Sequence, residues 1–187
     1  PEKKITFSPW PRIPYAEAMQ KYGSDKPDLR KDKKDPNELA FAFIVDWPFF
    51  EAEQKDGKWV ANHHIFTAPH TEDIGLLETD PAKVRSWQHD IALNGYEVAG
   101  GSIRSTDPKV FEKVLELVGV TKDEAKVQFG HMLEAFEYGV PPHGGIACGI
   151  ERLLALLLDV PNVREVVAFP KTGDNREPMT GSPSEVD

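Results

Sequence analysis

The chain has 187 residues, of which 40% are hydrophobic and 28% are charged, and this composition is typical of one soluble globular domain with a sizeable core. Its formal net charge of −9 disfavours non-specific binding to nucleic acid by the segment as a whole. A single cysteine, Cys148, excludes an internal disulfide framework and suits a reducing compartment, and the longest apolar run, 153–158, is too short to cross a membrane.

The N-terminal part of the chain predicts one helix, a linker and a pair of strands. Apolar residues at helical spacing predict a short helix over 15–22. Residues 31–37 form a short solvated linker of mixed charge. Residues 39–51 predict a strand, and the Asp56-Gly57 turn returns the chain through a second strand over 59–66.

Helix-capping motifs mark where the elements in the rest of the chain begin. Asp80-Pro81 and Asp107-Pro108 each place a capping residue before a proline at the first helical position, and Thr121 with Glu124 forms a capping box. We therefore expect, in chain order, a helix over 80–89, a β-hairpin over 90–104, two helices that begin at 107 and 121, a glycine-rich strand over 143–149, a helix over 150–158 and a strand over 163–169. Hairpins interspersed with helices indicate an α+β fold, with an antiparallel sheet flanked by helices.

The predicted hairpin over 90–104 turns at Asn94-Gly95, because both turn positions require a positive φ. In this register Ala92 lies opposite Glu97 and Asp90 lies opposite Ala99. A β-bulge at Gly100-Gly101 would add one residue and shift the alternation of the strand. The hairpin would then present one polar face made of Asp90, Glu97, Ser102 and Arg104.

Asp90 and Glu97 would be diagonal neighbours on that face, where two like charges repel each other. A magnesium ion held by both carboxylates and by substrate phosphates is the natural occupant. The alternative is an ordinary solvated strand face.

A second glycine-rich segment ends in Gly149-Ile150-Glu151-Arg152. Glycines let a ligand approach the backbone closely. Arg152 would lie in the first turn of a helix, where the macrodipole disfavours a cation, so its guanidinium has reason to bind a phosphate or to stack on a base. The segment therefore indicates a nucleotide site, and the alternative is a surface arginine paired with Glu151.

Two adjacent histidines, His63 and His64, fall on the predicted strand over 59–66. Neighbouring residues of a strand point to opposite faces, so only one of them would face the polar site. The alternative is a pair of packed or surface histidines. A zinc site built from His63, His70 and Cys148 would lack the close ligand spacing of known zinc motifs.

Eight short strings occur in order along nearly the whole chain: 15–19 with 22–30, then 44–48, 63–67, 94–104, 138–145, 149–152 and 168–171. Together they resemble the catalytic domain of class II aminoacyl-tRNA synthetases, and most closely the bacterial-type aspartyl-tRNA synthetases. The resemblance implies an ATP-dependent ligase that activates L-aspartate as aspartyl-adenylate and transfers it to tRNA(Asp), with ATP and Mg²⁺ required and no protein nucleophile.

The resemblance also implies roles for individual residues. ATP would be bound by Glu97, Gly149, Ile150, Glu151 and Arg152, and Mg²⁺ by Asp90 and Glu97. The aspartate substrate would be bound by His63 and Arg104, since a guanidinium pairs with a carboxylate through two parallel hydrogen bonds. His64 would then be the structural member of the histidine pair.

The chain also departs from the family pattern. The anticodon-binding domain and the first two class-defining motifs are not recognised, and the linker over 31–37 stands where the family has an insertion domain. We therefore expect residues 1–187 to be the C-terminal part of a catalytic domain, weakly active or inactive alone. Its full-length parent would be a cytoplasmic homodimer that does not bind membranes. The alternatives are a truncated paralogue, such as an amide-forming enzyme related to asparagine synthetase, or a non-catalytic adenylate-binding module.

Overall fold

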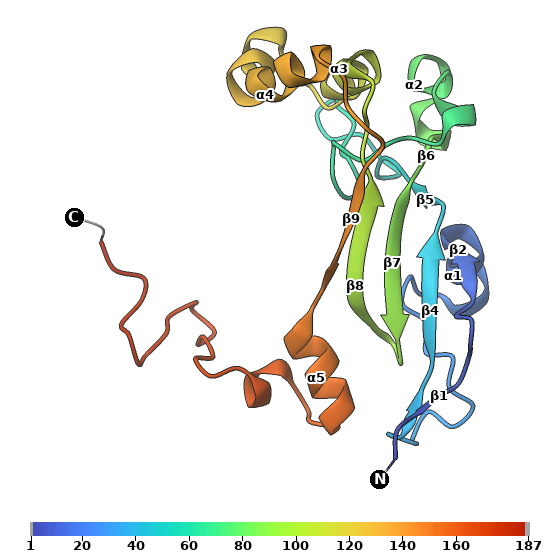
Figure 1. Ribbon diagram of the computed structural model, residues 1–187, viewed down its shortest axis with the longest axis vertical. Helices are drawn as coiled ribbons and strands as arrows, with labels where there is room; N and C mark the ends of the chain where they lie inside the picture. The colour runs from blue at the N-terminus through green and yellow to red at the C-terminus, as the bar shows by residue number, and fades with distance from the viewer. Residues whose placement is uncertain (1, 186–187) are drawn as a thin grey trace.

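A five-stranded sheet forms the centre of the computed structural model, which describes residues 2–185 (Figure 1). The strand order is β2-β4-β7-β8-β9; the β2–β4 pair is parallel and the other three pairs are antiparallel. The strands are β2 (Arg12–Pro14), β4 (Phe41–Val45), β7 (Gln88–Leu93), β8 (Tyr96–Ile103) and β9 (Gly144–Cys148). The predicted α+β class is therefore confirmed, with a sheet that is mixed at one edge.

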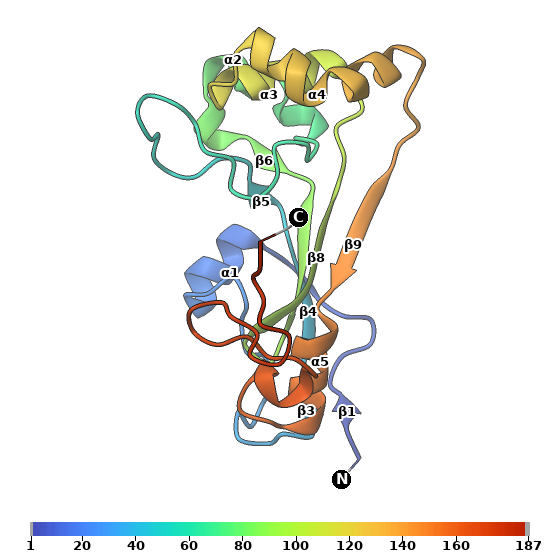
Figure 2. The same ribbon diagram turned by 90° about the vertical axis from the view of Figure 1, so that its left-hand side faces the viewer.

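The helices lie at the two ends and on both faces of this sheet (Figures 1 and 2). They are α1 (Tyr15–Tyr22), α2 (Leu76–Thr79), α3 (Pro108–Leu117), α4 (Lys122–Glu137) and α5 (Ile150–Leu158). Shorter elements are the 3₁₀ turns η1 (Thr71–Asp73), η2 (Pro81–Lys83) and η3 (Val163–Val166), and the two-residue strands β1 (Lys4–Ile5), β3 (Glu38–Leu39), β5 (Trp47–Pro48) and β6 (Arg85–Ser86). None of the helices in residues 2–185 is long and apolar enough to cross a lipid bilayer.

The two faces of the sheet have different cores. On one face, α5 packs its leucines against a cluster that includes Phe41, Ile91 and Ala99. On the other face, α1 packs Ala18 against the cluster that contains Ile44. Two further clusters lie beneath α2, α3 and α4 at the far end of the molecule. The face that carries α1 also carries the polar side chains of β7 and β8.

The helix signals in the sequence were reliable at four of the five helices. The structure confirms the predicted bounds of α1 and α5, and it ends α1 at Gly23 with a φ of 65°. Asp107 caps α3, and Thr121 and Glu124 form the predicted capping box of α4. In each case local backbone chemistry and tertiary packing favour the same element.

The helix predicted over 80–89 is wrong. Asp80-Pro81 begins only the single turn η2, and the chain then becomes extended at Val84. From Val84 to Asp90 every second residue is buried, which is the period of a strand. Pairing with β5 and β8 therefore overrides the local helix-start signal.

Three strand predictions also need correction. The strand over 39–51 is broken at Asp46, whose φ is 55°. The return after Asp56-Gly57 makes only isolated bridges, so 59–66 is not a strand. The strand over 163–169 is replaced by η3, where the side chain of Asn162 accepts a hydrogen bond from the backbone of Arg164. Among the described residues, the segments over 59–66 and 163–169 lack a neighbouring strand to complete a ladder, whereas the first segment is divided at Asp46 into the paired strands β4 and β5.

The central hairpin is confirmed, but its bulge lies elsewhere. Asn94 and Gly95 have φ values of 52° and 91°, as a two-residue turn of this kind requires. Ala92 pairs with Glu97 and Ile91 pairs with Ala99, so Val98 is the extra residue and the predicted bulge at Gly100-Gly101 is wrong. Asp90 consequently lies opposite Gly100 instead of Ala99.

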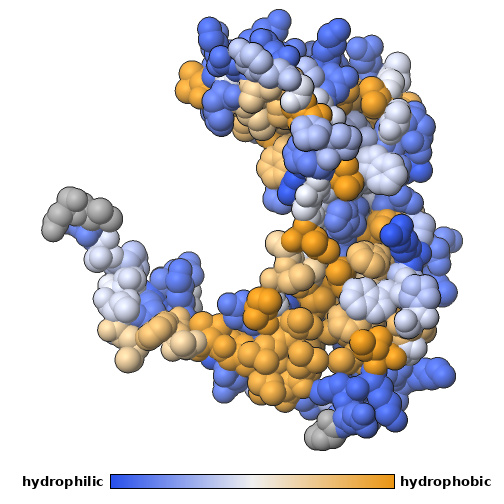
Figure 3. All heavy atoms as spheres, viewed as in Figure 1, coloured by the Kyte–Doolittle hydropathy of each residue, from blue (hydrophilic) through white to orange (hydrophobic). Residues whose placement is uncertain are grey.

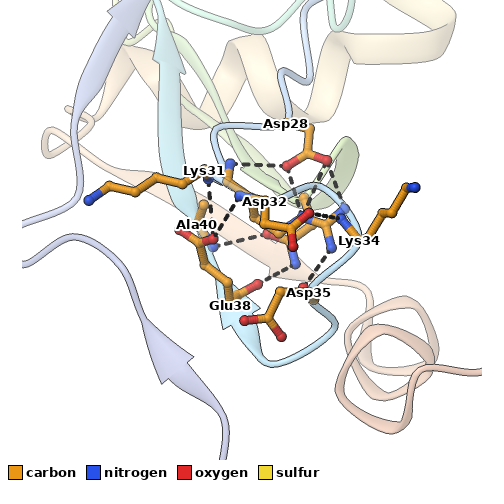
Figure 4. A network of polar contacts seen from close by, with 9 residues as sticks. Asp28, Lys31, Asp32, Lys34, Asp35, Glu38 and Ala40 are labelled. Carbon is orange, nitrogen blue, oxygen red and sulfur yellow. Dashed lines mark hydrogen bonds and ion pairs between the residues drawn. The ribbon is translucent and has the colours of Figure 1, made fainter.

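The charged linker is folded against the turn of this hairpin (Figure 4). Arg30 forms an ion pair of 2.7 Å with Asp28, and the Glu38 carboxylate accepts hydrogen bonds from the backbone of residues 31 and 32. The buried side chain of Asn94 accepts from the Ala40 amide at 3.0 Å and donates to the Glu38 carbonyl at 2.8 Å. Asn94 thus joins the hairpin turn to the start of β4.

Replacing Asn94 with glycine should destabilise the fold even though glycine tolerates the turn conformation. The Ala40 amide would lose its partner, so we expect a loss of about 2 kcal/mol in the free energy of unfolding, measured by urea denaturation. Asp56→Gly is the matched control, because Asp56 has a φ of 52° but is exposed and, within residues 2–185, makes no side-chain hydrogen bond. It should change stability by less than about 0.5 kcal/mol. Equal effects of the two substitutions would contradict the role of Asn94.

Candidate functional site

The two acidic residues of the polar face converge above Gly100. Asp90 is buried at 4% exposure, while Glu97 is exposed. A Cβ atom placed on Gly100 would lie 2.7 Å from Oδ1 of Asp90 and 3.3 Å from Oε1 of Glu97. The carboxylates of Asp90 and Glu97 therefore both lie above Gly100, and only glycine leaves room for them.

In the described part of the chain Glu97 forms no ion pair with a basic side chain, and the only ion-pair partner of Asp90 is His63. Nε2 of His63 lies 3.6 Å from Oδ2 of Asp90, and its ring stands edge-on to Trp47 at 4.6 Å. Two carboxylates without a cation are suited to bind a divalent metal together with phosphate oxygens. The carboxylate oxygens of Asp90 and Glu97, which converge above Gly100, are the hard ligands that Mg²⁺ prefers.

Arg104 lies farther along the same face, beyond Ser102. Its Nη1 donates to Oγ of Ser102 at 2.6 Å, and its guanidinium lies 4.5 Å above the ring of Phe66. Within residues 2–185 it forms no ion pair with an acidic side chain. A half-buried guanidinium that is held on two sides and lacks an anion is suited to bind a carboxylate.

A cavity of about 370 Å³ opens beside Arg104. Arg104 and His143 line it, together with apolar side chains from α3, from α4 and from the loop that contains His63 and His64. These apolar side chains are Phe66, Phe111, Met132 and Phe136. The sequence analysis did not predict these lining residues. The position of Phe66, an aromatic residue two positions after His64, was the one signal that could have indicated them. A larger cavity between α3 and α4 holds none of the predicted site residues.

Both histidines reach the site, so the expectation that only one could do so is wrong. They lie in a loop, where strand alternation does not apply. His63 lies beside Asp90, whereas His64 stacks on Phe66 at 4.8 Å, with Arg104 over the same ring. Burial lowers the pKa of His64, and the positive charge of Arg104 lowers it further.

Arg152 comes to the hairpin from the first turn of α5. Its Nη1 donates to the backbone carbonyl of Glu97, and it forms no ion pair with Glu151. The amide of Gly149 donates to the Val98 carbonyl at 2.8 Å, which fixes the start of α5 against β8. Glu97 and Arg152, which are 55 positions apart in the sequence, are thus adjacent. Figure 3 shows that this flank of the molecule is hollowed between the helical end and α5.

The residues of the zinc alternative lie in separate surroundings. His70 is stacked on Trp87 at 4.1 Å, between Asp46 and Glu72, and Cys148 is exposed on β9. Among residues 2–185 no group of three histidine, cysteine or acidic side chains is placed to hold a metal ion. The structure therefore contradicts a zinc site made of His63, His70 and Cys148.

The pKa of His64 offers a test of this geometry. Because the folded pKa is below the ordinary value, His64 disfavours the folded state as the pH falls below about 6.5, down to the folded pKa. Arg104→Gln should raise the pKa of His64, measured by NMR titration of the imidazole ring. His63→Asn should raise it less, because His63 contributes a smaller repulsion. An unchanged pKa of His64 in Arg104→Gln would contradict the proximity of Arg104 to His64.

Comparison with known proteins identifies relatives over most of the chain. Residues 2–173 match the family model of the class II tRNA synthetases (D, K and N). The aspartate–tRNA ligase of Lysinibacillus sphaericus is 50% identical over 155 residues, which are 83% of this chain and 26% of that protein. The aspartate–tRNA ligase of Enterococcus faecalis is 45% identical in an alignment of 177 residues that covers 87% of this chain and 30% of that protein. The chain thus spans less than a third of the length of these relatives.

Solved structures share the fold. The aspartyl tRNA synthetase of Entamoeba histolytica aligns with a TM-score of 0.65 at 24% identity, over 95% of this chain and 35% of that one. The asparaginyl-tRNA synthetase of Pyrococcus horikoshii, complexed with asparaginyl-adenylate, aligns with a TM-score of 0.60 at 23% identity, over 91% of this chain and 36% of that one. At these identities the alignments support the architecture alone.

Proposed function

The chain belongs to the class II tRNA synthetases (D, K and N), and from this membership we propose that it forms the part of an aspartate–tRNA ligase active site that binds aspartate, ATP and magnesium. The parent enzyme would activate L-aspartate with ATP and transfer the aspartyl group to tRNA(Asp). In this proposal residues 1–187 are part of the catalytic domain of a cytoplasmic homodimer. The single observation that carries the substrate assignment is the guanidinium of Arg104, held in place without an anion.

Arg104 would bind the side-chain carboxylate of aspartate. Ser102 and Phe66 orient the guanidinium, so little side-chain entropy remains to be lost on binding. Asparagine has the same shape but no charge, and it would leave the guanidinium without its counter-ion. We keep His63, which lies beside Asp90, as a proposed aspartate-binding residue, and His64, which stacks on the same Phe66 ring as Arg104, would be a second neighbour of this carboxylate.

Asp90 and Glu97 would hold Mg²⁺, which when bound would neutralise charge on the ATP phosphates. Gly149, Ile150 and Glu151 begin the helix against which the nucleotide would lie. Arg152 would donate to a phosphate and cover the base. Its hydrogen bond to the Glu97 carbonyl keeps this guanidinium next to the carboxylate pair.

The chemistry requires no nucleophile from the protein. The α-carboxylate of aspartate attacks the α-phosphorus of ATP, the bond to the β-phosphate breaks, and pyrophosphate leaves. A terminal ribose hydroxyl of the tRNA then attacks the carbonyl carbon of the adenylate, and AMP leaves. The residues of this chain contribute by positioning the reactants and by opposing their charges.

Binding of adenylate analogues tests the proposal directly. The chain, with Mg²⁺ present, should bind a non-hydrolysable aspartyl-adenylate analogue about 100-fold more tightly than the asparaginyl analogue by isothermal titration calorimetry, because one charge-assisted contact is lost. Arg104→Ala should remove this preference. Arg164→Ala is the control, since Arg164 is exposed and forms no ion pair in the described chain. Equal affinities of the unmodified chain for both analogues would overturn the aspartate assignment.

A further inference from the structure

Gln88 is a buried amide that the roles assigned above do not use. It is the first residue of β7 and is 4% exposed. It lies two positions before Asp90, so both side chains are on the polar face, and its cross-strand partner is Ser102. Gln88 therefore occupies the gap between the carboxylate pair and the Arg104 group.

The amide is bonded on one side only. Nε2 of Gln88 donates to Oδ1 of Asp90 at 2.8 Å, whereas Oε1 is buried without a hydrogen-bond partner. A buried, unpaired carbonyl oxygen destabilises the fold. A methionine or leucine would fill the same volume without that penalty, so packing alone does not account for glutamine at this position.

The two oxygens of Asp90 are consequently unequal. Oδ1 is fixed by Gln88, whereas among residues 2–185 Oδ2 accepts no hydrogen bond and lies 3.6 Å from Nε2 of His63. A neutral donor holds the carboxylate without cancelling its charge, unlike a lysine or arginine at the same place. Asp90 thus has one oxygen held by a neutral donor and one oxygen without a hydrogen bond.

We propose that Gln88 is a positioning residue for the metal: its amide fixes the rotamer of Asp90 so that the carboxylate stays above Gly100, beside Glu97. The inference rests on the proposed function, because it takes Asp90 and Glu97 as the residues that bind Mg²⁺. Ligands of metal ions are commonly oriented by hydrogen bonds from residues outside the coordination sphere. Gln88 supplies that hydrogen bond from within the same strand.

The probe is Mn²⁺, which substitutes for Mg²⁺ and whose free fraction is measured by electron paramagnetic resonance in the presence of ATP. Gln88→Met keeps the length of the side chain and removes the donor. It should weaken Mn²⁺ binding by about 10-fold. His89→Met is the matched control, because His89 is the next residue of β7 and lies on the opposite face, and it should leave Mn²⁺ binding unchanged.

A double variant separates positioning from structure. If Gln88 acts through Asp90, Gln88→Met should add no further loss in an Asp90→Asn background. Binding of aspartate, which depends on Arg104, should be retained in Gln88→Met. A general disturbance of the sheet would weaken both ligands together.

The outcomes distinguish this inference from the proposed function. Failure of the unmodified chain to bind Mn²⁺ with ATP would overturn both. Binding by the unmodified chain that is lost in Asp90→Asn but unchanged in Gln88→Met would overturn only the role of Gln88. Should Gln88→Met not fold, as judged by circular dichroism, Gln88→Asn provides the second variant, whose shorter amide does not reach Asp90. Unfolding of both variants would assign Gln88 a structural role and overturn the inference.

Discussion

The pairing of β7 with β8 is the constraint on which the rest of the structure depends. Successive side chains of a strand alternate between faces, so one inserted residue exchanges the faces of everything after it. The insertion is Val98, which lies between Glu97 and Ala99. It places Glu97, Ser102 and Arg104 on one face while Ala99 joins the core beneath α5. The site and the core of the sheet are therefore set by the same bulge.

The charged groups of the candidate site differ from the ion pairs elsewhere in the described chain. Asp73 is bonded by the guanidinium of Arg85, which lowers the pKa of the carboxyl, and Asp28 is bonded in the same way by Arg30. In each of these pairs the acidic side chain is neutralised by a guanidinium. The acidic and basic groups of the site are left apart instead, with Asp90 and Glu97 at one place and Arg104 at another. A bound metal ion could neutralise Asp90 and Glu97, and a negatively charged substrate group could neutralise Arg104.

The sequence predicted the elements whose local signals agree with their packing. The turn at Asn94-Gly95, the caps of α3 and α4 and the bounds of α5 follow from backbone chemistry that neighbouring residues determine. The polar face of the hairpin was also predicted, although its bulge was placed at Gly100-Gly101. Either position shifts the alternation by one residue before Ser102, so the membership of Ser102 and Arg104 in that face did not depend on which was right.

What the sequence did not predict depends on contacts between distant segments. The helix expected over 80–89 gives way to strands, because β6 and β7 pair with β5 and β4 from an earlier part of the chain. Phe66 beneath Arg104 and the carbonyl of Glu97 beneath Arg152 are contacts across 38 and 55 positions. Gln88 was overlooked because an amide beside a carboxylate has no signature in one sequence; only its burial and its unpaired oxygen make it conspicuous.

The bond from Arg152 to the Glu97 carbonyl bears on how the ligand-free chain moves. A guanidinium carries five N–H donors, so Arg152 can keep this bond and still offer a pair of donors to a phosphate. Helix α5 and the β7–β8 hairpin are therefore joined by a hydrogen bond without any bound nucleotide. A nucleotide bound by Arg152 and, through Mg²⁺, by Asp90 and Glu97 would form a second connection between α5 and the β7–β8 hairpin. Because these two elements already contact each other, less entropy would be lost when the nucleotide binds.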